Sequence, residues 1–355
     1  MFHRRLSAVA LVAVGALAVT TMSAPSSVAA EADHAEASST NRDTGEYWAT
    51  VIVQLEEGGG DHASRYADVK KRIGEAVAQV SPGATIQDVR DYHHVFEGFA
   101  IKVPAGSHDY RLEVPAATMA AIKGVQGVQA VVSVGVREPI VYPEIVGRAS
   151  DEIDDPSALT HADQASERGQ GRVIEVIDSG FDTSHEAFAG DMDAASLHLT
   201  QDSVASLASQ LGAGKGGVWV SPKIPFAYDY GDGDTDVLAT EEGGDGARSA
   251  NTQGTHVAAL AAANSGQFAG AAPQAQLIVA KVTKDPGNNA SDVDLLAALD
   301  DAMVLRPDVV SVSFSKTEGM SDAAASLYSQ VYETLGAQGT TVYAPAGDVE
   351  RYGRA

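Results

Sequence analysis

The sequence has 355 residues, with 24 lysines and arginines against 48 aspartates and glutamates and a formal net charge of −24 at pH 7. A chain this acidic repels phosphate backbones and anionic lipid, so nucleic-acid binding is excluded as a function class. The absence of cysteine excludes disulfides, thiolate zinc sites and cysteine nucleophiles. With 44% hydrophobic residues and the length of about two ordinary domains, the chain can bury a sizeable core.

Residues 1–30 have the organisation of a secretory signal peptide. Arg4 and Arg5 precede an apolar run that ends at Val19, and small residues precede a cut after Ala30. The run is shorter than the ~20 residues that span a bilayer, so cleavage is favoured over an uncleaved anchor. We therefore expect export, with no stable membrane insertion after cleavage. Residues 31–46 lack large apolar side chains and are expected to form a flexible leader.

Residues 47–140 have the pattern of a small domain of order β-α-β-β-α-β. Val69, Ile73 and Val77 recur at four-residue spacing and predict a helix over residues 61–80, and a second helix opens near Pro115. The strands are predicted at residues 50–55, 87–95, 98–103 and 129–134. This order is the ferredoxin-like arrangement, which hosts many functions and so assigns none by itself.

The region after residue 169 alternates buried strands with helices, and residues 141–168 are expected to be a linker. An apolar strand over residues 172–177 leads into Asp178, and further strands are predicted at 276–280, 308–314 and 340–344. The helices between them begin near Ser291 and Ser321. Right-handed crossovers then give an open parallel α/β sheet, whose functional side chains lie at the carboxyl ends of the strands. Asp178 occupies such an end.

Four sequence blocks resemble the subtilisin-like serine protease (subtilase, peptidase S8) family. They are Val176-Ile-Asp-Ser-Gly180, Asn251-Thr-Gln-Gly-Thr-His-Val-Ala258, Gly270-Ala-Ala-Pro273 and Ala275-Gln-Leu-Ile-Val-Ala-Lys-Val282. A block at residues 223–230 and the wide separation of the first two blocks are more similar to the large cell-envelope subtilases of Gram-positive bacteria. The resemblance implies an inhibitory propeptide over residues 47–140 and the amino-terminal portion of a catalytic domain over 169–355.

The family's chemistry uses a carboxylate to orient a histidine, which deprotonates the nucleophilic serine. The resemblance assigns Asp178 as the triad acid, although a turn residue before Ser-Gly is the alternative reading. Gln253 stands where the family has the general-base histidine, and a glutamine amide cannot take a proton near neutral pH. His256 matches a second histidine of the block and is expected to help pack the turn.

Two further departures from the family pattern lie near the carboxyl end. Asp348 stands where the family has the oxyanion-binding asparagine, and an ionised carboxylate repels an oxyanion unless burial keeps it protonated. No Gly-Thr-Ser nucleophile block occurs in the 355 residues, which we interpret as a carboxyl-terminal truncation. We therefore expect this chain to be catalytically incompetent.

Four carboxylates fall within a Gly-rich stretch and could wrap Ca²⁺: Asp229, Asp232, Asp234 and Asp236. The stretch does not match an EF-hand loop, because Val237 and Gly243 stand where that loop needs Gly and Glu. A solvated acidic loop is the alternative interpretation. The resemblance requires no other cofactor.

Two function classes remain. The first is a secreted or cell-envelope bacterial serine endopeptidase precursor in inactive form, whose partners are protein or peptide substrates or its own propeptide. The second is a non-catalytic pseudoprotease, or a propeptide-type protease inhibitor or peptide-binding protein. In the family, the strand matching residues 311–315 pairs with substrate backbone. Phe314-Ser315 replaces the family's Leu-Gly there, so we expect close backbone approach to be hindered, and an ordinary core strand is the alternative interpretation.

Overall fold

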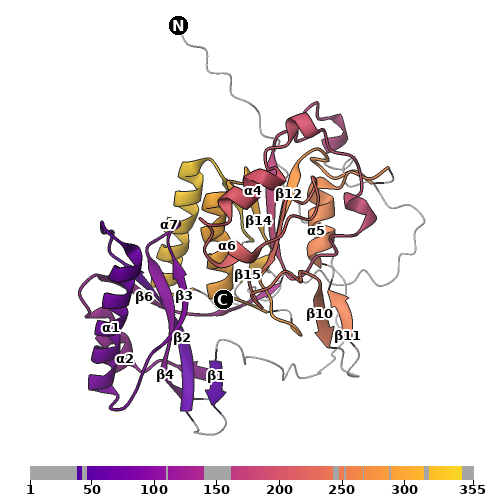
Figure 1. Ribbon diagram of the computed structural model, residues 1–355. Helices are drawn as coiled ribbons and strands as arrows, with labels where there is room; N and C mark the ends of the chain where they lie inside the picture. The colour runs from indigo at the N-terminus through magenta and orange to yellow at the C-terminus, as the bar shows by residue number, and fades with distance from the viewer. Residues whose placement is uncertain are drawn as a thin grey trace.

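The computed structural model describes residues 38–41, 46–108, 111–139, 161–242, 248–251, 253–266, 268–287, 289–315 and 320–345. The predicted signal peptide, most of the leader and linker, and Asp348 lie outside these residues. The described chain forms two units side by side, an amino-terminal antiparallel domain and a parallel sheet domain (Figure 1).

The amino-terminal domain is an antiparallel sheet with two helices on one face. Its strands lie in the order β3-β4-β2-β6, which is the ferredoxin-like order and confirms the predicted fold class. Two short strands extend the sheet beside β2 and β4. The elements are β1 (Ser38–Asn41), β2 (Glu46–Leu55), α1 (His62–Val80), β3 (Gln87–Tyr92), β4 (Gly98–His108), β5 (Arg111–Glu113), α2 (Ala116–Lys123) and β6 (Val128–Ser133).

Both faces of this antiparallel sheet are buried, which explains why β2 is almost continuously apolar. Val51 and Val53 point to the face covered by α1, where they join one hydrophobic core. Ile52, between them, points to the opposite face and belongs to the core of the sheet domain. Successive strand residues alternate sides, so a strand buried on both faces needs apolar residues at consecutive positions.

The sheet domain is built on five parallel strands in the order β16-β14-β8-β12-β9. This confirms the predicted open parallel sheet. Its elements include β8 (Val173–Asp178), α4 (Gln201–Leu207), β9 (Phe226–Asp229), α5 (Gln253–Ala262), β12 (Gln276–Lys281), α6 (Asp292–Leu305), β14 (Val309–Val312), α7 (Asp322–Gln338) and β16 (Thr341–Tyr343). A hairpin of β10 (Ala239–Glu242) and β11 (Arg248–Asn251) lies outside this sheet.

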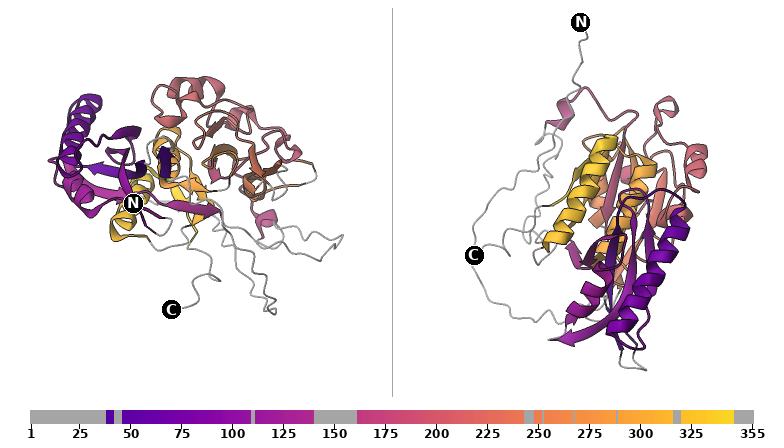
Figure 2. Two further views of the ribbon diagram at one scale, coloured as in Figure 1. Left: turned by 90° about the horizontal axis from the view of Figure 1, so that it is seen from below. Right: turned by 90° about the vertical axis from the view of Figure 1, so that its left-hand side faces the viewer.

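Helices cover the two faces of the parallel sheet. Val173 and Ile177 pack with residues of α6 and α7 on one face, whereas Val176 packs with residues of α5 on the other. The amino-terminal domain lies against α6 and α7 (Figures 1 and 2), with β3 beside α6 and β6 beside α7. Because Ile52, Ala100 and Val132 share a core with these helices, the contact between the two units is apolar at its centre.

A small separate sheet joins the two units. The strand β7 (Val136–Pro139), which follows the amino-terminal domain, lies between β13 (Ala290–Ser291) and β15 (Phe314–Ser315) of the sheet domain. Both pairings are antiparallel. The segment that follows the amino-terminal domain therefore forms the central strand of a three-stranded sheet, and the two outer strands belong to the sheet domain.

Candidate functional site

The candidate site lies at the carboxyl end of β8, where sequence analysis expected it. Asp178 is fully buried, and its Oδ1 accepts hydrogen bonds from the N–H (2.7 Å) and hydroxyl (3.2 Å) of Ser179. Oδ2 is buried and accepts no hydrogen bond from the described residues. Burial raises the pKa of Asp178, while the neighbouring Ser313 and Ser179 groups oppose that rise. The side chain thus offers a buried carboxyl oxygen.

The start of α5 packs directly on the turn that follows Asp178. Gly254 lies so close that a Cβ atom there would be 2.5 Å from the carbonyl oxygen of Gly180 and 2.8 Å from the ring of Phe181. The hydroxyl of Thr255 accepts the N–H of Asp182 at 2.7 Å. These contacts bring the Gln253 block and the Asp178 block together, as the family pattern implies.

His256 differs from the expectation that it packs the turn. It is exposed on α5, and Gly254 and Thr255 make the contacts with the turn instead. Its charge still acts on Asp178 and lowers the pKa of that carboxyl slightly against the larger effect of burial. His256 therefore lies within electrostatic range of the candidate triad acid without holding the loop in place.

The three-stranded sheet is connected to the end of β8 through Ser313, the residue before β15. Pro139 of β7 pairs with Phe314, and Glu138 pairs with Ser315, so the antiparallel register runs from β7 toward Ser313. The N–H of Ser313 in turn donates to the carbonyl of Ile177, next to Asp178, at 3.2 Å. Ser315 does not keep the backbones apart, and the expected hindrance at this position was wrong.

The acidic loop is arranged around a lysine that sequence analysis missed. The buried ammonium of Lys281 lies 2.5 Å from Asp229 and 3.3 Å from Asp232, and it donates to the carbonyl of Thr283 at 2.8 Å. Asp285 lies 3.4 Å away. Burial raises the pKa of Asp229 to about 6, although Lys281 opposes that rise. The acids also raise the pKa of Lys281 despite its burial.

The two remaining acids of the loop serve its backbone. Asp234 accepts the N–H of Asp236, and Asp236 accepts the N–H of Leu238, as side chains do in Asx turns. Across the described ranges, no three histidines or carboxylates are grouped so that they could hold a metal ion. Of the carboxylates predicted to bind Ca²⁺, Asp229 and Asp232 thus accept hydrogen bonds from Lys281. The other two accept backbone N–H groups within turns.

Acidic residues of α6 hold the amino-terminal domain, and these too were missed from the sequence. The carboxylate of Asp300 accepts the backbone N–H groups of His93, His94 and Val95, with shortest distances of 3.2, 2.8 and 2.9 Å. The sequence signal is the set of four aspartates in the helix predicted to begin near Ser291, namely Asp292, Asp294, Asp300 and Asp301. The partners of Asp300 lie more than 200 residues away in the sequence, so spacing could not identify them.

Two further carboxylates of α6 complete this interface. Asp292 accepts the N–H of Gly135, which precedes β7, at 2.8 Å, and the hydroxyl of Tyr328 at 2.8 Å. Asp294 forms an ion pair with Arg90 of β3 at 3.1 Å. Buried polar groups stabilise a contact only when they are paired, and these are. The interface is therefore specific as well as apolar.

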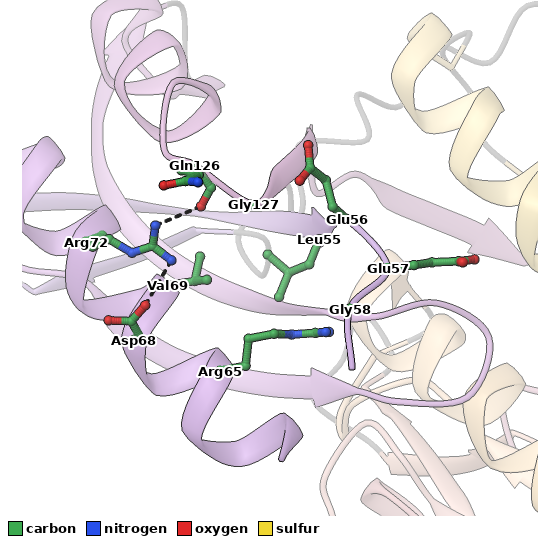
Figure 3. A pocket seen from close by; sticks show the side chains of 10 residues that line it. All are labelled: Leu55, Glu56, Glu57, Gly58, Arg65, Asp68, Val69, Arg72, Gln126 and Gly127. Atoms are coloured by element: carbon green, nitrogen blue, oxygen red, sulfur yellow. Dashed lines mark hydrogen bonds and ion pairs between the residues drawn. The ribbon is translucent and has the colours of Figure 1, made fainter. Parts of the chain in front are cut away.

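A groove of about 480 Å³ lies apart from these residues, in the amino-terminal domain (Figure 3). Arg65 and Arg72 of α1 line it, but their charges are neutralised by Glu97 and Asp68. Glu56 and Glu57 make its rim acidic.

Comparison with known proteins identifies a family and several relatives of this chain. A family model described as "Subtilase family" matches residues 169–352. The PII-type proteinase of Lactococcus lactis subsp. cremoris is 28% identical over 165 residues, which cover 43% of this chain and 8% of that protein. The C5a peptidase of Streptococcus pyogenes serotype M6 is 24% identical over 210 residues, which cover 57% of this chain and 17% of that protein. The chain thus spans less than a fifth of the length of these relatives.

Proposed function

The chain belongs to the subtilase family, and from this premise we propose that it is a secreted subtilisin-like serine endopeptidase precursor in a catalytically incompetent form. The observation that carries the proposal is the path of β7. This strand pairs with β13 on one side and with β15 on the other. Ser313, which precedes β15, bonds through its N–H to Ile177, the residue before Asp178. In this proposal the amino-terminal domain acts as an inhibitory propeptide, and β7 occupies the strand position between β13 and β15 that an extended substrate would take.

The interface supports this role for the amino-terminal domain. Its sheet buries Ile52, Ala100 and Val132 against the helices of the sheet domain, and Asp300 accepts three of its backbone N–H groups. An extended segment held in a groove by backbone pairing blocks any other strand from the same edge. Because β7 fills the strand position between β13 and β15, a substrate strand is blocked from it whatever the state of the catalytic groups.

Incompetence is proposed from Gln253. Acyl transfer by a serine needs a base that takes its proton and returns it to the leaving amine, and a carboxamide does neither. Deleting a member of such a triad costs several powers of ten in rate. With Gln253 at the base position, Asp178 has no imidazole there to orient. Asp348, at the oxyanion position, adds an unfavourable charge.

The purified 355-residue chain tests this directly. We expect neither casein hydrolysis above the buffer blank nor labelling by a fluorophosphonate, which reacts with activated serines. Asp178→Asn is the matched control, because it preserves shape and removes the proposed triad acid. Hydrolysis by the wild-type chain that Asp178→Asn abolishes would refute incompetence.

A second function is favoured by the same strand pairing: holding extended peptides without cutting them, or inhibiting another protease through residues 47–140. The strands β13 and β15 accept a central strand with backbone pairing on both sides. We expect a fluorescent peptide of residues 133–142 to bind an Asp300→Ala chain, in which docking is weakened, more tightly than wild type. Equal anisotropy changes for both chains would contradict peptide binding between β13 and β15.

Export and a cell-envelope location belong to the same proposal. They rest on residues 1–30 and on the bacterial proteinases to which the chain is similar. No helix among the described ranges has the length and apolarity needed to cross a membrane. Expression in a Gram-positive host should release a product that begins at Glu31, which amino-terminal sequencing would detect. Retention of Met1 in the cell fraction would contradict export.

A further inference from the structure

Glu175 is a buried acid that the candidate site does not use. It lies in the middle of β8 with no exposed surface, and neither carboxyl oxygen has a hydrogen-bond partner among the described residues. Its register partners are the buried side chains of Ile278 in β12 and Val310 in β14. Both belong to the core under α6, so Glu175 faces that helix from an apolar surrounding.

The groups that face this carboxyl are acidic rather than basic. On α6, Asp301 is buried and accepts the N–H groups of Gly212 at 2.5 Å and Gly214 at 2.6 Å, and the hydroxyl of Tyr230 at 3.1 Å. Asp301 and Glu175 act on one another electrostatically, and Glu175 also acts on Tyr230. The other charged groups nearby are Asp300 and Asp294 of α6 and Arg90 of β3, which pairs with Asp294.

Asp301 is adjacent in sequence to the residue that holds the amino-terminal domain. Asp300 accepts the N–H groups of residues 93–95, so any movement of this part of α6 away from β8 also moves the docking contact. A charged carboxylate without a partner in an apolar core is far less stable than its neutral form. Ionisation of Glu175 therefore favours a position of α6 that admits water.

We propose that Glu175 is a proton-binding group that makes the docking of the amino-terminal domain depend on pH, tight while the carboxyl is protonated and loosened when it ionises. Burial and the charge of Asp301 raise the pKa of Glu175 well above its ordinary value. The closed arrangement thus holds a proton that an opened, hydrated arrangement releases at an ordinary carboxyl pKa. Closure is favoured at low pH and is lost progressively as pH rises toward the raised pKa. The device does not depend on catalytic competence.

Hydrogen exchange of the amides of residues 93–95 tests this in the full chain. Protection would be measured from pH 5 to 9 and corrected for the intrinsic exchange rate, in wild type, Glu175→Gln and Glu175→Leu. The matched control is Glu186→Gln, which removes an exposed carboxyl of the same domain.

We expect wild-type protection to fall with pH more steeply than in either Glu175 variant, by up to about tenfold per pH unit, the slope of one proton. Glu186→Gln should follow wild type. Parallel slopes in wild type and both Glu175 variants would overturn the proposal. Failure of both variants to fold would also overturn it, because glutamine is the uncharged equivalent of the protonated side chain.

Discussion

Replacing Asp300 by alanine should separate the two units of the chain. The wild-type carboxylate is 2% exposed and accepts the N–H groups of His93, His94 and Val95. A hydrogen bond to a charged acceptor contributes about 1.5–3 kcal/mol, and removing the acceptor leaves the donors without a partner. Three bonds to one carboxylate are not additive, so we expect docking to weaken by about 3–5 kcal/mol. This corresponds to roughly a hundredfold to several thousandfold in the docking equilibrium.

Two tryptophans allow the separation to be measured. Trp48 lies in β2 and Trp219 in the sheet domain, so Trp48→Phe and Trp219→Phe chains each report one unit by fluorescence. In urea, the two reporters should give one midpoint in the wild-type background, because docked units unfold together. In the Asp300→Ala background, they should give two separate midpoints.

Two controls sharpen the result. Asp300→Asn keeps a carbonyl acceptor and should lose less than Asp300→Ala, while Asp88→Ala removes an exposed acid of the amino-terminal domain and should change neither midpoint. Coincident midpoints in Asp300→Ala would refute the reasoning, since they would show that the apolar contact alone couples the units.

Three further outcomes are expected. The buried ammonium of Lys223 donates to the carbonyls of Pro273 and Ala275, and burial lowers its pKa to about 7. Because the unfolded chain binds this proton up to about pH 10.5, the free energy of unfolding should rise from pH 7 to 9.5 relative to Lys223→Met, by at most about 3 kcal/mol. Equal pH slopes in urea titrations of the two chains would contradict this. Calcium added to chelated protein should leave the melting temperature unchanged, because the Lys281 ammonium already pairs with Asp229 and Asp232. A calcium-dependent rise in calorimetry would support the metal site. Gly254→Ala should lower stability by about 1–3 kcal/mol, since its Cβ would meet backbone at 2.5 Å, and a melting temperature equal to wild type would show that the turn yields.

The fold was predictable where one physical signal dominated. The spacing of Val69, Ile73 and Val77 specified α1, and the apolar strand ending at Asp178 specified β8, because burial on a helix face or in a parallel sheet imposes these periods. The β-α-β-β-α-β order then limited the antiparallel domain to one common arrangement. Both units were correctly predicted for these reasons.

The contacts that position the site were not predictable from spacing. Lys281 reaches Asp229 across 52 residues, and Asp300 reaches His93 across 207, so only the packed structure brings them together. A strand lysine and a helical aspartate read as surface residues until their partners are known. The pairing of Ser315 with β7 was missed for a different reason, since the effect of a small side chain on backbone approach depends on where it points.

The central claim is tested most directly by the intact mass of the purified chain. Pro139 and Glu138 of β7 pair with Phe314 and Ser315, and under the proposed function a competent centre would cut the chain on the carboxyl side of this strand. With Gln253 at the base position, we predict a single uncut polypeptide from Glu31 to Ala355 after prolonged incubation at neutral pH. A cut just beyond Pro139 that Asp178→Asn abolishes would contradict the account.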